Sequence, residues 1–197
     1  MELLNNIDIQ LTILINSVLP HTQFFDYFFS FFSLRGSSIF IWIIVIVAVL
    51  ILEERKYPGI QKRDIRFLII FLLSFTTSFI TSDFVLKNLI KRSRPLPLSA
   101  TLSDASSAKW LTQCPKDYSF PSTHATTAFA SATILTFFDK KRKWFYYVVA
   151  MFISLSRIYL GCHYFFDIIG GGIIGLIISN VILGSVATPE SILDKPE

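Results

Sequence analysis

The sequence predicts an all-α integral membrane protein, a bundle of five or six transmembrane helices with an interfacial helix at its N-terminus. Three observations lead to this prediction. Apolar residues make up 52% of the 197 residues, and the mean hydropathy of +0.56 is high for a soluble protein. Twenty residues are Phe. The charged residues lie in clusters between apolar runs, which is typical of loops between membrane spans. We expect a single membrane-embedded domain over residues 1–197.

Residues 1–36 predict an interfacial region followed by a Phe-rich helix from Phe24. Asp8, Gln10, Asn16 and Pro20 interrupt the apolar residues, so no run of about 20 apolar residues is available for a regular span. A first tilted span is the alternative. The first charged residue is Glu2, without the basic region and small-residue cleavage site of a secretory signal, so we expect no cleaved segment.

Five later apolar runs predict transmembrane helices, each ending at polar or charged residues. They cover residues 37–52, 65–86, 125–138, 144–155 and 165–186. The basic loops 55–66 and 140–143 should face the cytoplasm by the positive-inside tendency. Segments 87–120 and 160–164 then lie on the extracytoplasmic side. In the last span we expect the glycines from Gly170 to Gly175 to allow close packing between helices.

Four cations fall on the outer side, where the positive-inside tendency disfavours them: Lys87, Lys91, Arg92 and Arg94. Their position indicates an anionic ligand such as phosphate. For Lys91 and Arg92 the alternative is that they extend toward anionic lipid headgroups. The net charge of +4 is not arranged along one face, so we expect no nucleic-acid partner.

Residues 156–167 place Arg157, His163 and Asp167 in an otherwise apolar half of the chain. If a helix begins near His163, Asp167 lies one turn further on the same face and can hold one imidazole nitrogen. The other nitrogen is then free to act as a nucleophile, while Arg157 can bind phosphate oxygens in pairs. A structural polar cluster is the alternative reading of these three residues.

Two other stretches contribute residues of the same kind. Lys87 and Arg94 are seven residues apart, so on one helix they are neighbours over two turns. Pro121 suits the first turn of a helix, which leaves Ser122, Thr123 and their backbone N–H groups free to bind an anion. His124 would then lie beside that anion.

Together these stretches resemble the three motifs of the type 2 phosphatidic acid phosphatase superfamily. Thr123 stands where the family has Gly, which affects only the local backbone. The motifs cover residues 87–167. The matching residues are Lys87, Arg94 and Pro95 in the first motif, Pro121, Ser122 and His124 in the second, and Ser156, Arg157, His163 and Asp167 in the third.

The resemblance implies a metal-independent reaction with no cofactor. His163 would attack phosphorus and form a phosphohistidine, Asp167 would orient it, and His124 would protonate the departing oxygen. The phosphate would be held by Lys87, Arg94, Ser122, Thr123 and Arg157.

A lipid phosphate in the bilayer is the expected substrate, because the site lies at the ends of the spans of a multi-pass protein of the cell membrane. The chain resembles bacterial undecaprenyl-diphosphate phosphatases, which recycle the carrier of cell-wall precursors; phosphatidic acid and phosphatidylglycerol phosphate are alternative substrates. Lys91 and Arg92, as extra charges, favour a diphosphate. Rival classes are a vanadate-dependent haloperoxidase, although those enzymes are large and soluble, and a lipid-binding or transport protein without chemistry.

Cys114 and Cys162 are predicted to be free thiols, since two cysteines do not form a disulfide framework and have no metal-ligand spacing. Because both are predicted on the outer side, a disulfide that tethers the loop is the alternative. The Ser-rich segment 96–118 predicts an irregular loop that orders on substrate.

Overall fold

The computed structural model describes residues 2–33, 37–54, 62–95 and 114–186, and within these ranges it contains helices and no strands. Two helices precede the bundle, as the interrupted N-terminal pattern predicts, and the Phe-rich helix begins at Gln23. In chain order the principal helices are α1 (Glu2–Val18), α2 (Gln23–Ser33), α3 (Ser37–Glu54), α4 (Lys62–Phe79), α7 (Thr123–Phe138), α8 (Lys143–Tyr159) and α9 (Phe165–Val186).

The five predicted spans agree with the helices within a few residues at each end. The second is longer than expected because α4 continues through a π-helix, η1 (Ile80–Leu86), into α5 (Lys87–Ile90). Among the residues that the structure describes, two helices are long and apolar enough to cross a membrane by length and composition, Lys62–Ile90 and Phe165–Val186, and a shorter apolar helix covers Ile39–Leu52. The expected all-helical class is therefore confirmed.

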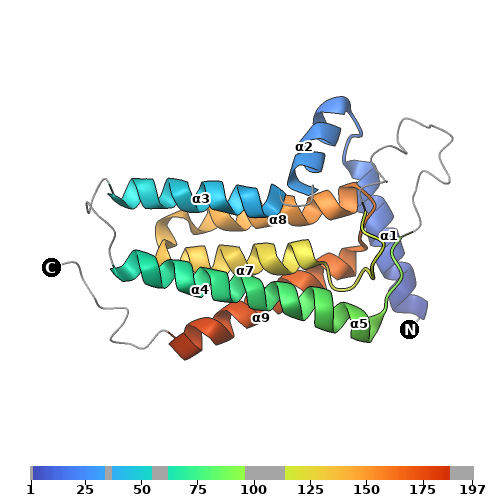
Figure 1. Cartoon of the computed structure of the whole chain (residues 1–197). Coiled ribbons are helices and arrows are strands. Elements are labelled where there is room, and N and C mark those ends of the chain that lie inside the picture. Colours follow the sequence, from blue (N-terminus) through green and yellow to red (C-terminus); the bar gives the residue numbers. More distant parts are fainter. Residues whose placement is uncertain (1, 34–36, 55–61, 96–113, 187–197) are drawn as a thin grey trace.

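Helix α7 forms the centre of the bundle and contacts α4, α8 and α9. Ten of its 16 residues are Ala, Thr or Ser, and eight of these are buried. Small side chains let neighbouring helices approach closely, which suits α7 to the centre of the bundle. In Figure 1, α3, α4, α7 and α8 run side by side, α9 crosses behind them, and α1 lies across one end.

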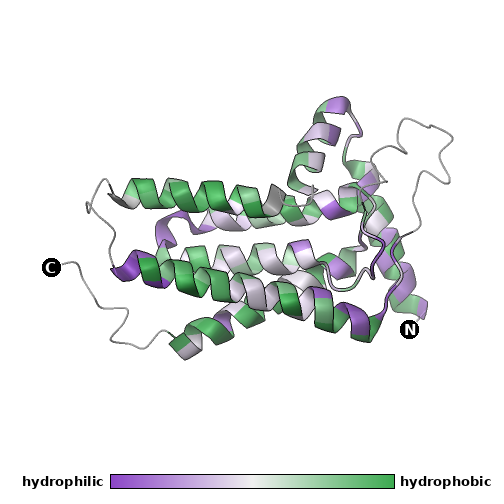
Figure 2. Ribbon diagram, in the orientation of Figure 1, coloured by the Kyte–Doolittle hydropathy of each residue, from purple (hydrophilic) through white to green (hydrophobic). Residues whose placement is uncertain are grey.

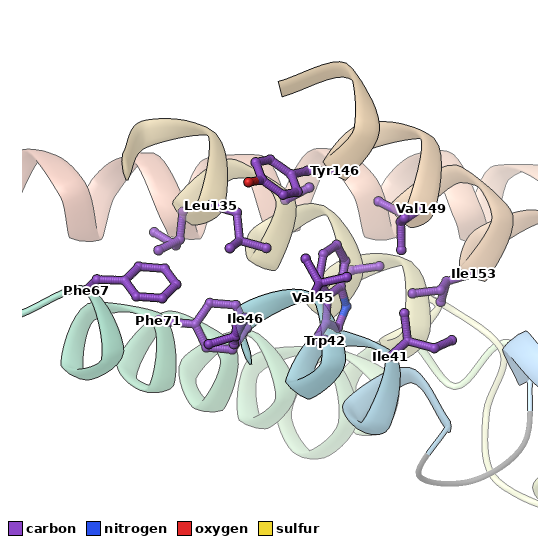
Figure 3. Packing of buried hydrophobic residues seen from close by; sticks show 14 of the residues in the cluster. Ile41, Trp42, Val45, Ile46, Phe67, Phe71, Leu135, Tyr146, Val149 and Ile153 are labelled. Carbon is purple, nitrogen blue, oxygen red and sulfur yellow. The ribbon is translucent and has the colours of Figure 1, made fainter. Parts of the chain in front are cut away.

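The apolar core joins α3, α4, α7 and α8. Trp42 of α3 is 1% exposed and lies among Phe71 of α4, Leu135 of α7 and Tyr146 of α8 (Figure 3). On the outward faces of α3, α4 and α9 large apolar side chains are exposed, and Figure 2 shows α3 and α4 as hydrophobic along most of their length. A soluble monomer rarely exposes so much contiguous apolar surface, whereas a lipid-facing surface requires it. Examples are Ile43, Val47, Ile69, Leu72, Ile173, Ile177 and Val181.

Two glycines of α9 bring its backbone against the start of α7. A Cβ at Gly171 would lie 2.7 Å from the Ser122 carbonyl oxygen, and one at Gly175 would lie 2.2 Å from the Thr126 carbonyl oxygen. Both contacts are to backbone, which cannot swing away as a side chain can. The expected packing role of the glycines follows from this close approach, which sets the beginning of α7 beside that of α9.

Gly175→Ala is expected to destabilise the bundle by about 1–3 kcal/mol, because α7 and α9 must separate to admit the methyl group. Gly184→Ala is the matched control, since a Cβ there meets nothing within 4 Å and Ala favours a helix. Thermal unfolding of the two detergent-solubilised variants provides the measurement. Equal melting temperatures would contradict the proposed close packing.

Candidate active site

His163 lies in the turn between α8 and α9 and is 2% exposed. Its Nδ1 is 3.4 Å from Oδ2 of Asp167, a fully buried carboxylate in the first turn of α9. The distance is within ion-pair range and longer than an optimal hydrogen bond. Helix α9 begins at Phe165, where the last apolar run predicts it, and the expected four-residue contact is present.

The partners of His163 define its tautomer. Nη1 of Arg94 lies 3.0 Å from Nε2 of His163, and a guanidinium can only donate. Nε2 must therefore be the acceptor, which assigns the ring proton to Nδ1, facing Asp167. Burial lowers the pKa of His163 well below its ordinary value, and the nearby cations Arg94, Arg157 and Lys87 lower it further. The imidazole is therefore neutral near pH 7, with its lone pair on Nε2.

Lys87 and Arg94 converge on one carboxylate, that of Asp117. Nζ of buried Lys87 contacts Oδ2 of Asp117 and lies 2.6 Å from Oδ1 of Asp83, while Nη2 of Arg94 is 2.5 Å from Oδ1 of Asp117. The two cations are therefore close together, as expected. The expected helical geometry is wrong, because the helix ends at Ile90 and Arg94 reaches the site from the segment that follows.

Asp117 was not among the predicted site residues, and no pattern in the sequence marks it. Its burial raises the pKa of the carboxyl, but hydrogen bonds from Lys87 and Arg94 outweigh this effect and the pKa is lowered. An anionic carboxylate thus bridges the two cations that were predicted to bind phosphate. A phosphate that binds both cations must displace it.

Asp117→Asn is expected to tighten the binding of inorganic phosphate about five- to tenfold, because the amide competes less well for two cations than a carboxylate does. Calorimetric titration of the detergent-solubilised protein with phosphate would measure this change. Asp26→Asn is the control, since Asp26 accepts a hydrogen bond from Tyr159 and contacts neither cation. Unchanged or weaker phosphate binding in Asp117→Asn would contradict the displacement.

Ser122, Thr123 and His124 form the start of α7. Ser122 is the N-cap residue, and its buried Oγ has no hydrogen-bond partner among the residues that the structure describes. Its backbone N–H donates to the carbonyl oxygen of Asp167 at 3.1 Å, which ties this helix start to α9. The Thr123 hydroxyl donates to Asp83 at 2.9 Å. His124, in the first turn, lies near enough to His163 to interact with it electrostatically.

Arg157 is 1% exposed and lies in the last turn of α8. Its Nη1 donates to the Ser33 carbonyl oxygen at 3.0 Å and contacts the Ser33 hydroxyl, so part of its guanidinium is held by α2. It also lies near enough to His163 to lower the pKa of that residue. All eight predicted site residues are thus gathered at one end of the bundle, although Arg157 has a structural partner that the sequence did not reveal.

Arg92 has a different setting from the one expected. Its guanidinium lies between two buried carboxylates, with Nη1 2.7 Å from Oδ1 of Asp167 and Nη2 2.6 Å from Oδ2 of Asp8. It is neither directed at a lipid headgroup nor available as an extra charge for a diphosphate. The argument for a diphosphate that used Arg92 therefore no longer holds.

Lys91 is exposed and ends α5 in a left-handed conformation with a φ of 51°. We expect Lys91→Ala to retain more than about a tenth of wild-type turnover, because a solvated cation contributes little to a site that it does not line. Lys87→Ala, which removes a buried cation, is the matched comparison and should lose far more. A larger loss in Lys91→Ala would assign Lys91 to the phosphate site.

Cys114 and Cys162 form a disulfide, with their Cα atoms 5.4 Å apart, so the prediction of free thiols is wrong. The bond joins residues 48 positions apart and links the segment before Asp117 to the residue before His163. Sequence spacing could not indicate this pairing, because only the folded chain brings the two segments together.

The fold and the site together define a helical protein with exposed apolar faces and a cluster of histidines, cations and carboxylates at one end of its bundle. A family model described as the PAP2 superfamily matches residues 67–189. The chain therefore belongs to the PAP2 superfamily, which confirms the resemblance shown by its three motifs.

Two curated relatives and one solved structure extend this result. The lipid A 4'-phosphatase of Bacteroides thetaiotaomicron is 28% identical over 88% of this chain and 74% of its own length. An undecaprenyl-diphosphatase of Sulfolobus acidocaldarius is 28% identical over 71% of this chain and 61% of its own. The crystal structure of a transmembrane PAP2-type phosphatidylglycerolphosphate phosphatase from Bacillus subtilis is similar over the whole of this chain and 90% of its own chain. The TM-score is 0.62 and the sequence identity is 21%. These relatives support a membrane-bound phosphatase.

Proposed function

We propose that the protein hydrolyses a phosphate from a membrane lipid phosphate or diphosphate through a phosphohistidine, without a metal ion. The observation that carries this proposal is the setting of His163. Its Nδ1 faces a buried carboxylate and its Nε2 carries the lone pair beside Arg94, with Lys87 close by. This is the arrangement of a nucleophile that is oriented by a third group and placed next to cations.

In the first step Nε2 of His163 attacks phosphorus and the bond between phosphorus and the leaving oxygen breaks. His124, in its protonated imidazolium form, donates a proton to that oxygen and becomes neutral. In the second step His124 takes a proton from water, the water oxygen bonds to phosphorus, and the bond between phosphorus and Nε2 breaks, which releases phosphate. Lys87, Arg94 and Arg157, with Ser122 and the Thr123 N–H, stabilise the charge on the equatorial oxygens.

Substrate binding requires two exchanges at this site. Asp117 must release Lys87 and Arg94, and Arg94 must move its Nη1 from His163 to a phosphate oxygen. Each exchange replaces one hydrogen bond to a cation by another, so neither leaves a buried charge unpaired. The incoming phosphate thereby exposes the nucleophile that will attack it.

Undecaprenyl diphosphate is the proposed physiological substrate. An open cavity of about 560 Å³ adjoins Arg94 and Asp117, and Lys116 on its wall adds a cation for a second phosphate group. The undecaprenyl-diphosphatase relative supports the same choice. Lipid A bearing a 4'-phosphate is the second candidate, because the lipid A 4'-phosphatase relative matches more of this chain than the undecaprenyl-diphosphatase does. Phosphatidic acid and phosphatidylglycerol phosphate are further candidate substrates. Lipid binding or transport is the non-enzymatic alternative.

The proposed setting is the cell membrane, which the chain crosses several times. The proposed site residues lie at the ends of α5 and α8 and at the starts of α7 and α9, which Figure 1 shows at one end of the bundle. The basic residues 62–66 and 140–143 lie at the other end of the bundle. By the positive-inside tendency that end faces the cytoplasm, so the site opens on the extracytoplasmic side. Cysteine labelling of intact cells at single positions on each end would test this orientation.

Phosphate release from detergent-solubilised protein tests the function. Undecaprenyl diphosphate, lipid A, phosphatidic acid and phosphatidylglycerol phosphate are supplied in parallel in EDTA, with His163→Ala as the control. Release that persists in EDTA and is absent from His163→Ala would support the proposed reaction, and the order of rates would identify the lipid. Release that EDTA abolishes would contradict the metal-free mechanism, and release from none of the lipids would favour the non-enzymatic alternative.

A further inference from the structure

Helix α1 carries a fully buried carboxylate, Asp8, although the rest of that helix is largely exposed. A buried carboxylate is costly unless it is paired and hydrogen-bonded. Asp8 meets this requirement because it accepts a hydrogen bond from Phe166 N–H of α9 and pairs with Arg92. Both of these partners lie within residues 67–189, which match the family model, whereas α1 lies outside that range. The N-terminal helix therefore contacts the candidate site through a residue that no motif includes.

Asp8 and Thr12 cap the start of α9. The first backbone N–H groups of a helix have no partner within the helix. Here Phe165 N–H donates to the Thr12 hydroxyl at 2.9 Å, and Phe166 N–H donates to Oδ1 of Asp8 at 2.8 Å. One turn of α1 thus supplies the partners for the helix start that carries Asp167. Figure 1 shows α1 lying across this end of the bundle.

Arg92 connects Asp8 to Asp167. One nitrogen of its guanidinium is 2.6 Å from Oδ2 of Asp8 and another is 2.7 Å from Oδ1 of Asp167. The guanidinium carbon also lies 4.2 Å from the centre of the Tyr164 ring. With these contacts on several sides, Arg92 binds only one oxygen of Asp167. The other oxygen, Oδ2, accepts from Tyr164 N–H at 2.9 Å and faces Nδ1 of His163.

We propose that Asp8 is a positioning residue, which holds Arg92 so that Oδ2 of Asp167 remains directed at His163. Without the charge of Asp8, Arg92 is free to bind both oxygens of Asp167, which is the preferred geometry of an arginine–carboxylate pair. Oδ2 would then turn away from His163, and the imidazole would lose its orientation. The proposal rests on the proposed function for its catalytic meaning, whereas the geometry can be tested without a substrate.

Asp8→Asn removes the negative charge of Asp8 and keeps a side chain of nearly the same size and geometry. The amide oxygen can still accept from Phe166 N–H, so the cap of α9 is retained while the charge beside Arg92 is lost. Thr12→Val is the complementary variant, because it removes an acceptor at the same helix start and leaves the charge in place. Asp26→Asn is the control for loss of a hydrogen-bonded carboxylate in the N-terminal region, since Asp26 binds Tyr159.

Orthovanadate and inorganic phosphate are the probes, used on each detergent-solubilised variant without lipid. Phosphate needs only the cations, whereas vanadate also forms a bond to Nε2 of an oriented histidine. We expect Asp8→Asn to weaken vanadate about tenfold or more and to leave the phosphate Kd within about twofold. Thr12→Val and Asp26→Asn should keep the wild-type ratio of the two affinities. Turnover measured in parallel should fall in kcat rather than in KM.

The outcomes separate this proposal from the proposed function. A wild-type ratio of vanadate to phosphate affinity in Asp8→Asn would overturn the positioning role, even if lipid hydrolysis is established. A selective loss of vanadate binding would support it, even if every lipid tested fails as a substrate. If wild-type protein itself binds vanadate no more tightly than phosphate, the oriented histidine on which the role depends is absent and the proposal is overturned.

Arg92→Lys keeps the test decisive if Asp8→Asn does not fold. Arg92 lies on the segment after α5 and is partly exposed, so its replacement disturbs the packing less than a change within α1. Lysine retains the charge but has no planar fork with which to bridge two carboxylates. It should show the same selective loss of vanadate affinity, and a wild-type ratio in Arg92→Lys would overturn the proposal.

Discussion

His163→Ala is expected to lower phosphate release by at least about a thousandfold, because removal of a nucleophile leaves only binding and charge stabilisation. The loss should appear in kcat, since Lys87 and Arg94, the cations proposed to bind phosphate, are untouched. His21→Ala is the matched control: His21 is exposed, stacks on Tyr159 and lies outside the candidate site. Initial rates with the best lipid substrate give the comparison.

The pH dependence of the wild-type enzyme adds a second readout for His163. Burial, followed by the neighbouring cations, lowers the pKa of this residue. The neutral imidazole therefore persists at pH values below the ordinary histidine pKa of about 6.5. The acid limb of kcat/KM that reflects His163 should therefore lie below pH 6.5. Folding stability should also decrease as the pH falls through 6.5, because the unfolded chain then binds a proton that folded His163 does not.

Persistent turnover in His163→Ala would remove the phosphohistidine from the mechanism. A direct check is to quench the wild-type reaction in alkali, where a phosphohistidine survives longer than in acid, and to locate the phosphate by mass spectrometry. Phosphate found on His124 in place of His163 would reverse the proposed roles of the two histidines.

Arg94→Ala is expected to lower kcat about a hundredfold or more, which is the usual effect of removing a donor that stabilises charge in a transition state. Arg94 contacts both His163 and Asp117, so it lies between the proposed nucleophile and the carboxylate that a phosphate is proposed to displace. Arg94→Lys should recover little of this activity, because an ammonium cannot reproduce the paired donors of a guanidinium.

Arg142→Ala is the control for the loss of an arginine in an ion pair. Arg142 pairs with Asp139 at the other end of the bundle, and we expect its replacement to leave turnover unchanged. If Arg94→Ala instead keeps kcat and only raises KM, Arg94 binds substrate and transition state equally and its assigned role is wrong. An effect in Arg142→Ala as large as that in Arg94→Ala would point to a general loss of folding.

The sequence alone predicted the helices and the family. Long apolar runs identify helices locally, and the last of them, 165–186, coincides with α9 at both ends. The spacing of the three motifs identified the superfamily without any knowledge of the fold. The contact between His163 and Asp167 could also be anticipated, because it depends on residues four apart in one short stretch.

The tertiary structure decided the contacts between distant parts of the chain. Asp117 meets Lys87 across 30 positions, the disulfide joins residues 48 positions apart, and the Phe166 N–H meets Asp8 across 158. No periodicity relates such pairs, because their proximity results from how the helices pack and not from local backbone geometry. Arg92 illustrates the consequence: by sequence it was a spare cation, and packing places it between two buried carboxylates. Local patterns therefore identified the motif residues, and helix packing determined which other residues lie among them and which of their charges are already paired.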